Sequence, residues 1–97
     1  MNIIRGTTPN IRFTFSEVNP TNFVKAYLSI PEAQIRKDID EATIGTNYVE
    51  WRLSQAETLS FGDNVSAMFN GLTSDGIRIA SEKTLFVVEK NYIEEVI

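Results

Sequence analysis

The strongest constraint on the fold is a hydrophobic pattern with a period of two residues. Apolar and polar residues alternate over 11–16, 24–30 and 48–53, and again over 65–73. Such alternation is typical of strands that bury one face, whereas an amphipathic helix needs apolar residues three or four positions apart. The chain is therefore expected to consist mainly of β-strands.

Turn signals separate these segments. Residues 19–22 combine two asparagines with a proline, and Pro31 closes the second strand. Proline presets φ and lacks an amide donor, while asparagine tolerates a left-handed backbone. Asp75-Gly76 is the strongest hairpin signal, because glycine supplies the positive φ that tight turns require.

Two segments are less regular. Ile35 to Ile39 suggests a weak strand at a sheet edge, and the loop after it is expected to place Gly45 and Asn47 in the left-handed region. The last strand is expected to start at Ile77 and to run to Val88, with a break or bulge near residues 81–82.

One helical signal interrupts the strand pattern. Ser54 and Glu57 have the spacing of a capping box, and Gly62 is expected to end the helix. The sequence therefore predicts one short helical turn near residues 55–60.

Six or seven short strands in 97 residues indicate an all-β fold, an immunoglobulin-like antiparallel β-sandwich, with residues 1–97 as a single domain. A small barrel is the alternative. The residues expected to be buried together are Phe13, Phe15, Leu28, Trp51, Leu53 and Phe69.

Composition excludes several function classes. The chain has no cysteine and no histidine, so it lacks thiolate and imidazole metal ligands and the usual nucleophile–histidine pairs. A net charge of −4 argues against binding to a phosphate backbone. We expect a protein that is not an enzyme, with no cofactor, no metal, no nucleic acid and no small-molecule substrate.

The acidic run 38–41 suggests calcium, but the spacing is wrong. Where an EF-hand loop needs an oxygen ligand, a glycine and a glutamate, this chain has Ala42, Thr43 and Val49. Glu94 and Glu95 are adjacent and point different ways, so they form no acid–base pair. Both features are interpreted as solvated acidic surface.

No targeting segment is predicted. The first nine residues lack the apolar run of a secretory signal, and the longest apolar stretch, Leu85 to Val88, is far too short to span a membrane. The chain is therefore expected to stay in the cytosol where it is made, unless it leaves as part of a larger particle.

The C-terminal part of the chain is more apolar than a monomer obviously needs. Residues 85–88 are apolar on both faces of a strand, and 92–97 keep four apolar residues. We expect the last strand at a sheet edge, where this segment either covers its own core or contacts another protein. The candidate interaction residues are Leu85, Phe86, Val88, Tyr92, Ile93, Val96 and Ile97.

Several short motifs resemble one group of proteins. The opening Arg5-Gly6-Thr7-Thr8-Pro9 with the alternating strand to Phe15, residues 23–28, residues 51–58 and the turn 74–76 resemble small structural proteins of tailed phages and prophages of Gram-positive bacteria. The same plan is similar to the N-terminal β-sandwich domain of phage baseplate upper proteins. Pro31 to Gln34 departs from it, because a tight turn is expected there.

The resemblance implies a non-enzymatic structural or assembly protein, associated with the tail or baseplate, whose partners are other phage proteins or further copies of itself. It also implies assembly in the bacterial cytoplasm and a final location in the virion. The alternative is a stand-alone recognition domain for a cell-surface carbohydrate. An exposed pair of Tyr27 and Tyr48 would favour the carbohydrate, and an apolar patch joining Val88 to Ile97 would favour protein binding.

Overall fold

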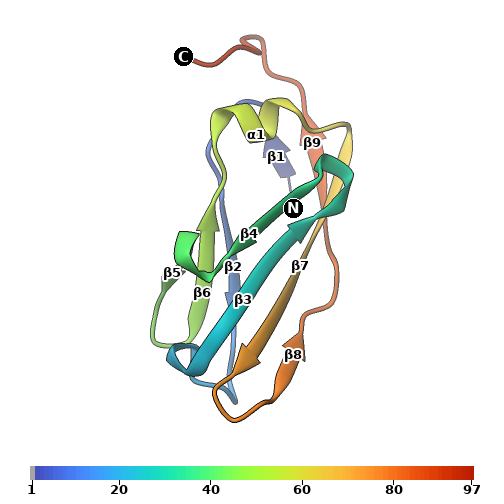
Figure 1. The fold of residues 1–97 in the computed structure, drawn as a ribbon. Helices are drawn as coiled ribbons and strands as arrows, with labels where there is room; N and C mark the ends of the chain where they lie inside the picture. The colour runs from blue at the N-terminus through green and yellow to red at the C-terminus, as the bar shows by residue number, and fades with distance from the viewer. Residues whose placement is uncertain (1) are drawn as a thin grey trace.

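Two β-sheets enclose one apolar core in the computed structural model, which describes residues 2–97 (Figure 1). The larger sheet contains, in spatial order, β1 (Asn2–Ile4), β9 (Thr84–Glu89), β7 (Asn64–Thr73), β3 (Phe23–Ile30) and β4 (Ile35–Asp38), with β8 (Arg78–Ala80) also paired to β7. The smaller sheet contains β2 (Asn10–Thr14), β6 (Tyr48–Arg52) and β5 (Thr43–Ile44). The chain is therefore mostly β, with a sandwich-like arrangement. Met1, the first residue of the predicted domain 1–97, lies outside the described residues.

The strand count and direction differ from the prediction. Residues 2–97 form nine strands rather than six or seven, and β1 pairs with β9 in parallel, with Ile3 level with Val88. The sheet is therefore mixed and not purely antiparallel. β1 has three residues, which is too short for an alternating pattern to identify it.

The predicted break near Ser81 is confirmed. Strands β8 and β9 pair with successive halves of β7, and Ser81 stands between them. Its amide donates to the carbonyl of Phe69 at 3.0 Å, and its hydroxyl accepts from the amide of Phe69 at 2.9 Å. Ser81 thus keeps the backbone groups of β7 satisfied where the neighbouring strand is interrupted.

Most of the predicted turns also form. Gly76 has φ +87° in the β7–β8 hairpin, and the amide of Thr73 donates to the carbonyl of Ile77 at 2.9 Å. The 19–22 cluster forms a short 3-10 helix, η1 (Pro20–Asn22), capped by the side chain of Asn19. A second one, η2 (Pro31–Ala33), follows β3 directly, in place of a tight turn.

The left-handed positions were predicted wrongly at Gly45 and Asn47. Within residues 2–97, positive φ occurs at Gly6, Gln34 and Gly76. Gly45 serves a different need: the ring of Tyr48 packs so closely on its backbone that a Cβ would overlap the ring. Gly45 is therefore explained by the Tyr48 ring that lies against its backbone and not by a positive φ.

The predicted helical turn is confirmed as α1 (Gln55–Leu59). The hydroxyl of Ser54 accepts from the amide of Glu57 at 3.1 Å, and the amide of Ser54 donates to the Glu57 carboxylate at 2.8 Å. This is the predicted capping box. The helix ends at Leu59 with Ser60 as its cap, before Gly62 is reached.

The core is an aromatic cluster between the sheets. Phe69 on β7 lies with its ring centroid 5.5 Å from that of Phe13 and 6.0 Å from that of Trp51, both on the smaller sheet. Five of the six predicted core residues are buried. The sixth, Phe15, is half-buried and packs edge-on against Phe69, with the two ring centroids 5.0 Å apart.

The segment 5–9 connects the two sheets. Arg5 donates to the carbonyl of Phe61 at 3.0 Å, and the amide of Gly6 donates to the hydroxyl of Thr58 at 3.0 Å. That hydroxyl in turn donates to the carbonyl of Thr7 at 2.8 Å. The crossing between sheets is thereby tied to α1 and the loop after it.

Candidate functional site

The structure divides the predicted interaction residues into two groups. Phe86 and Val88 point into the core, with 3% and 6% of their surface exposed, whereas Leu85 and Val87 face solvent. Strand β9 is also no free edge, because β1 pairs along residues 87–89. The prediction that Phe86 and Val88 lie at an interaction edge was therefore wrong: one face of this apolar run completes the domain's own core.

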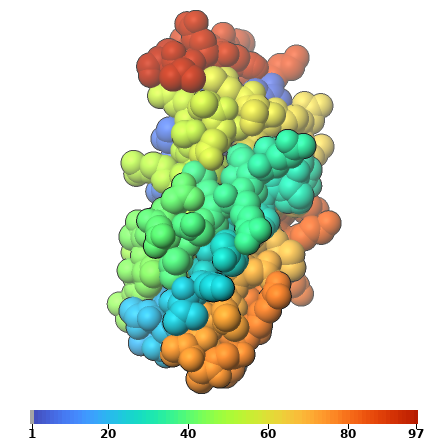
Figure 2. Space-filling view, in the orientation of Figure 1, coloured from blue at the N-terminus to red at the C-terminus, as the bar shows by residue number. Residues whose placement is uncertain are grey.

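The C-terminal group, for which the sequence leaves burial and exposure open, is exposed. Each of the four apolar side chains of 92–97 keeps more than half of its surface exposed: Tyr92, Ile93, Val96 and Ile97. Figure 2 shows the end of the chain standing over α1 at one end of the molecule. We call these four residues the C-terminal apolar surface.

Polar contacts hold this segment in place. The amide of Ile97 donates to the Gln55 side chain at 2.8 Å, and the same side chain donates to the carbonyl of Ile97 at 3.1 Å. Arg5 binds the Glu94 carboxylate at 3.2 Å, and the Asn91 side chain donates to the carbonyl of Arg5 at 3.0 Å. The backbone is anchored while the apolar side chains remain in solvent.

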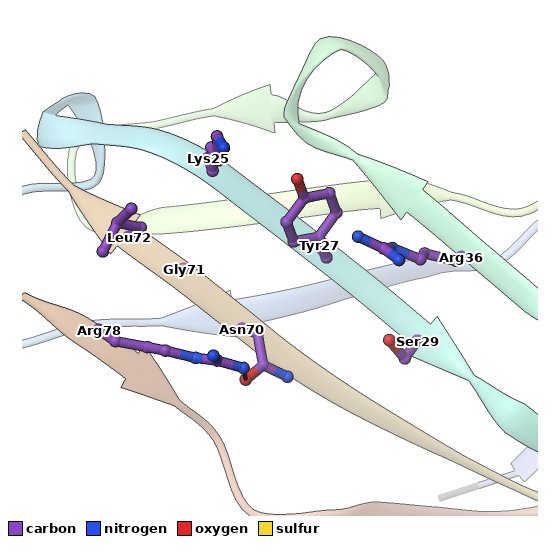
Figure 3. Close-up of a pocket in the computed structure, with 8 residues that line it drawn as sticks. All are labelled: Lys25, Tyr27, Ser29, Arg36, Asn70, Gly71, Leu72 and Arg78. Carbon is purple, nitrogen blue, oxygen red and sulfur yellow. Dashed lines mark hydrogen bonds between the residues drawn. The ribbon is translucent and has the colours of Figure 1, made fainter.

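A second candidate lies on the outer face of the larger sheet. There a groove of about 490 Å³ runs over strands β4, β3, β7 and β8 (Figure 3). The residues that line it are Lys25, Tyr27, Ser29, Arg36, Asn70, Gly71, Leu72 and Arg78. We call it the basic groove, because its three charged side chains are all cationic.

The pairing register arranges these residues in three rows across the sheet. Lys25, Leu72 and Arg78 are level with one another, and Tyr27 is level with Asn70 in the next row. Arg36 is level with Ser29 in the third row. The backbone of each cationic residue therefore lies in one of the two outer rows, and Tyr27 and Asn70 lie in the middle row.

Two of the three cations are oriented by neighbours. The guanidinium of Arg36 lies over the ring of Tyr27, 4.2 Å from its centroid, which is cation–π distance. The guanidinium of Arg78 donates to the side-chain oxygen of Asn70 at 3.1 Å. Figure 3 shows both arginines extended along the sheet toward these partners. Each guanidinium keeps further donors for another ligand.

The groove is electropositive in an acidic chain. In residues 2–97 the ion pairs engage Arg5, Arg12 and Lys37, so no groove cation is neutralised by a carboxylate. The carboxylate nearest in register is that of Asp38, across from Tyr27, and it accepts from the amide of Asp40 at 3.0 Å in the cap of a 3-10 helix, η3 (Ile39–Glu41). The acidic run 38–41 is thus a local cap, in keeping with its interpretation as acidic surface.

The two tyrosines do not form a shared surface. Tyr27 lies on the outer face of the larger sheet and Tyr48 on the outer face of the smaller one. Arg12 lies over the Tyr48 ring, 3.8 Å from its centroid, and its ion pair with Glu50 at 2.8 Å raises the pKa of the guanidinium. Likewise, Val88 is buried, so no apolar patch joins it to Ile97.

Local sequence patterns do not predict the basic groove. Lys25, Tyr27 and Ser29 are the polar half of one alternating strand, and Arg36, Asn70 and Arg78 come from three other strands. Only the strand order and register bring them together. A useful signal would have been that all three cations fall on solvent-facing positions of predicted strands.

Two general findings apply to residues 2–97. No group of three or more acidic side chains there has a geometry that could hold a metal ion. None of the helices in this part of the chain combines the length and apolarity needed to cross a membrane. The sequence matches no protein-family model, and no curated protein is similar to it at a significant level.

Proposed function

We propose that this chain is a non-enzymatic structural or assembly protein of a phage or prophage particle, associated with the tail or baseplate, that acts by binding other proteins. We further propose that its two sheets are an immunoglobulin-like sandwich. The proposal rests on the resemblance in residues 5–15, 23–28, 51–58 and 74–76 and on one structural observation, the C-terminal apolar surface.

That surface supports protein binding because it is both apolar and ordered by polar contacts. Exposed apolar side chains gathered in one place are typical of interaction sites. Here Gln55 holds the backbone at Ile97 and Arg5 holds the carboxylate of Glu94, so the apolar side chains are presented without being buried. Anchoring in advance reduces the conformational entropy that a partner would have to overcome.

The residues that carry the resemblance also build this end of the molecule. Arg5 contacts the carbonyl of Phe61 and the carboxylate of Glu94, and Thr58 holds Gly6 and Thr7. The motif at residues 5–9 is therefore part of the support for the C-terminal apolar surface, which is the place where we propose that partners bind.

The direct test replaces the apolar side chains and keeps the anchors. Tyr92, Ile93, Val96 and Ile97 are changed together to serine, leaving Arg5, Gln55, Asn91 and Glu94 in place. The control changes two exposed apolar residues elsewhere, Val24 and Ile77, each 55% exposed, to serine. Sedimentation velocity is run on each protein alone and with the purified structural proteins encoded beside it.

We expect both variants to stay folded by circular dichroism, because all six side chains are exposed. The C-terminal variant should lose association that the wild type and the control retain. Equal association by all three proteins would contradict the assignment of this surface. A wild type that associates neither with itself nor with any neighbouring structural protein would contradict the proposed function.

The alternative, recognition of a cell-surface carbohydrate, has weaker support. Sugars stack on open aromatic faces, and in this domain an arginine covers one face of both Tyr27 and Tyr48. The two rings also belong to different sheets. We therefore favour protein binding.

A further inference from the structure

We propose that the basic groove is a second protein-binding site and that its ligand is an extended, acidic segment of a partner protein. The groove lies on the outer face of β4, β3, β7 and β8, whereas the C-terminal apolar surface lies beyond β9 and over α1 (Figures 1 and 3). The two sites are separate, so a test that contradicts binding at one of them leaves the other proposal unaffected.

Charge is the first argument. The chain has nine cationic and thirteen anionic side chains, so anionic side chains outnumber cationic ones in the chain as a whole. The residues that line this groove include three cations and no carboxylate, and none of these cations has an ion-pair partner in residues 2–97. A ligand with negative charge complements this groove better than it complements the rest of the domain.

Preorganisation is the second argument. Arg36 is stacked on Tyr27 and Arg78 is held by Asn70, so both guanidinium planes are oriented before a ligand arrives. A planar guanidinium matches a carboxylate with two parallel hydrogen bonds. Orientation in advance lowers the entropic cost of that contact.

Spacing is the third argument. Neighbouring rows of the groove are two residues apart along a strand, which is about 6.6 Å. An extended peptide presents every second side chain to one side with the same repeat. The guanidinium groups of Arg36 and Arg78 reach Tyr27 and Asn70 in the middle row, whereas Lys25 lies one row away. Acidic side chains two residues apart on an extended peptide would therefore meet the two guanidinium groups and Lys25 in neighbouring rows.

This spread of charge favours a peptide over a phosphate ligand. Tight phosphate sites converge several donors, often backbone amides, on one point. Here the three cations come from different strands, β3, β4 and β8, and the two guanidinium groups contact different partners, Tyr27 and Asn70. A linear series of carboxylates uses this layout more completely.

The test uses two synthetic peptides of about eight residues, a length that spans the three rows. One alternates glutamate with threonine, and the other has glutamine in place of glutamate. Binding to the full chain is followed by amide chemical shifts in low salt, about 0.05 M, and again at about 0.5 M, where exposed charges are screened. An oligothymidylate and a short glycerol-phosphate polymer serve as competing anions.

The key variant is Arg36→Gln with Arg78→Gln, and its matched control is Arg52→Gln with Lys90→Gln. All four residues are exposed, and neither pair takes part in an ion pair within residues 2–97. Both double variants change the net charge equally, so they separate a local site from general attraction. Lys25→Gln with Arg78→Gln gives a second, independent change in the groove.

We expect the glutamate peptide to shift amides of β3, β4, β7 and β8, and the glutamine peptide to leave them unchanged. Each groove variant should weaken binding about tenfold or more, the control by less than about twofold, and high salt should abolish it. Equal losses in groove and control variants would overturn the proposal. Tighter binding of the oligonucleotide or the phosphate polymer at the same residues would also overturn it, in favour of a phosphate ligand.

Discussion

The indole nitrogen of Trp51 donates a hydrogen bond to the carbonyl oxygen of Asp38 at 2.8 Å. Trp51 belongs to β6, the central strand of the smaller sheet, and Asp38 ends β4 at the edge of the larger sheet. The bond therefore joins the two sheets at the point where β4 gives way to η3. Because Trp51 is 1% exposed, no water can replace the indole donor without rearrangement.

This contact predicts a graded response to substitution. Trp51→Phe keeps most of the packing but removes the donor, and it should lower the free energy of unfolding by about 1–3 kcal/mol. Trp51→Ala also opens a cavity and should cost about 3–5 kcal/mol, a large part of the stability of a small domain. Denaturant titration measures both. No loss in Trp51→Phe would mean that the hydrogen bond contributes nothing, and equal losses in both variants would mean that the packing of the ring contributes nothing.

A second prediction concerns the connection between the sheets. Thr58 is fully buried, and its hydroxyl bonds both to the amide of Gly6 and to the carbonyl of Thr7. Thr58→Val keeps the shape but leaves both backbone groups without this partner, so it should cost about 1–3 kcal/mol. Thr43→Val on β5 is the control, because Thr43 is exposed. It should change the free energy of unfolding, measured by denaturant titration, by less than about 0.5 kcal/mol.

The glycines give a matched pair. A Cβ at Gly71 would lie 2.7 Å from ring atoms of Phe23 and Phe69, whereas a Cβ at Gly62 would meet nothing within 4 Å. Gly71→Ala should destabilise the domain by about 1–3 kcal/mol, because both rings belong to the core. Gly62→Ala should be neutral or stabilising by about 0.4–1 kcal/mol. Similar melting temperatures for the two variants would contradict this description of the core.

Acid should weaken one specific contact. The two oxygens of the Glu32 carboxylate accept hydrogen bonds from the amide and the hydroxyl of Ser66, at 3.0 and 2.7 Å. Both bonds lower the pKa of Glu32, and the bond from the amide has the larger effect. A lowered pKa in the folded state stabilises the fold above the unfolded pKa, about 4.3, and this contribution is lost as the pH falls through the folded pKa.

Glu32→Gln should therefore reduce the loss of stability between pH of about 5 and about 3, measured by denaturant titration. Glu57 contributes in the same direction: burial opposes its ionisation, but bonds from Ser54 and Lys37 outweigh burial and lower its pKa. Some acid sensitivity should thus remain in Glu32→Gln. The control is Glu17→Gln, at an exposed site outside strands and helices, and an equal effect there would refute the role of Glu32.

The sequence predicts those parts of the fold that depend on local patterns. The alternating residues of β2, β3, β6 and β7, the capping box at Ser54 and the Asp75–Gly76 turn are all found where expected. Each is decided by residues within a few positions of one another.

The features that sequence reasoning missed depend on contacts between distant segments. Three residues of β1 gain strand structure only by pairing with β9, and this pairing turns the predicted edge into the interior of a sheet. Phe86 and Val88 are buried because their side chains pack into the core between the two sheets. The basic groove is a product of register across four strands, which no local pattern encodes.

We propose that this domain is a component of a phage particle or of its assembly intermediates. The most direct measurement is to induce particle production in a bacterium that carries the gene for this chain, to separate particles and partial tails from free proteins, and to quantify this chain in each fraction by mass spectrometry. Wild-type protein should be found in particles or partial tails at a fixed ratio to a tail protein, and the C-terminal serine variant should be displaced to the free fraction. Wild-type protein found only as free monomer would contradict the account.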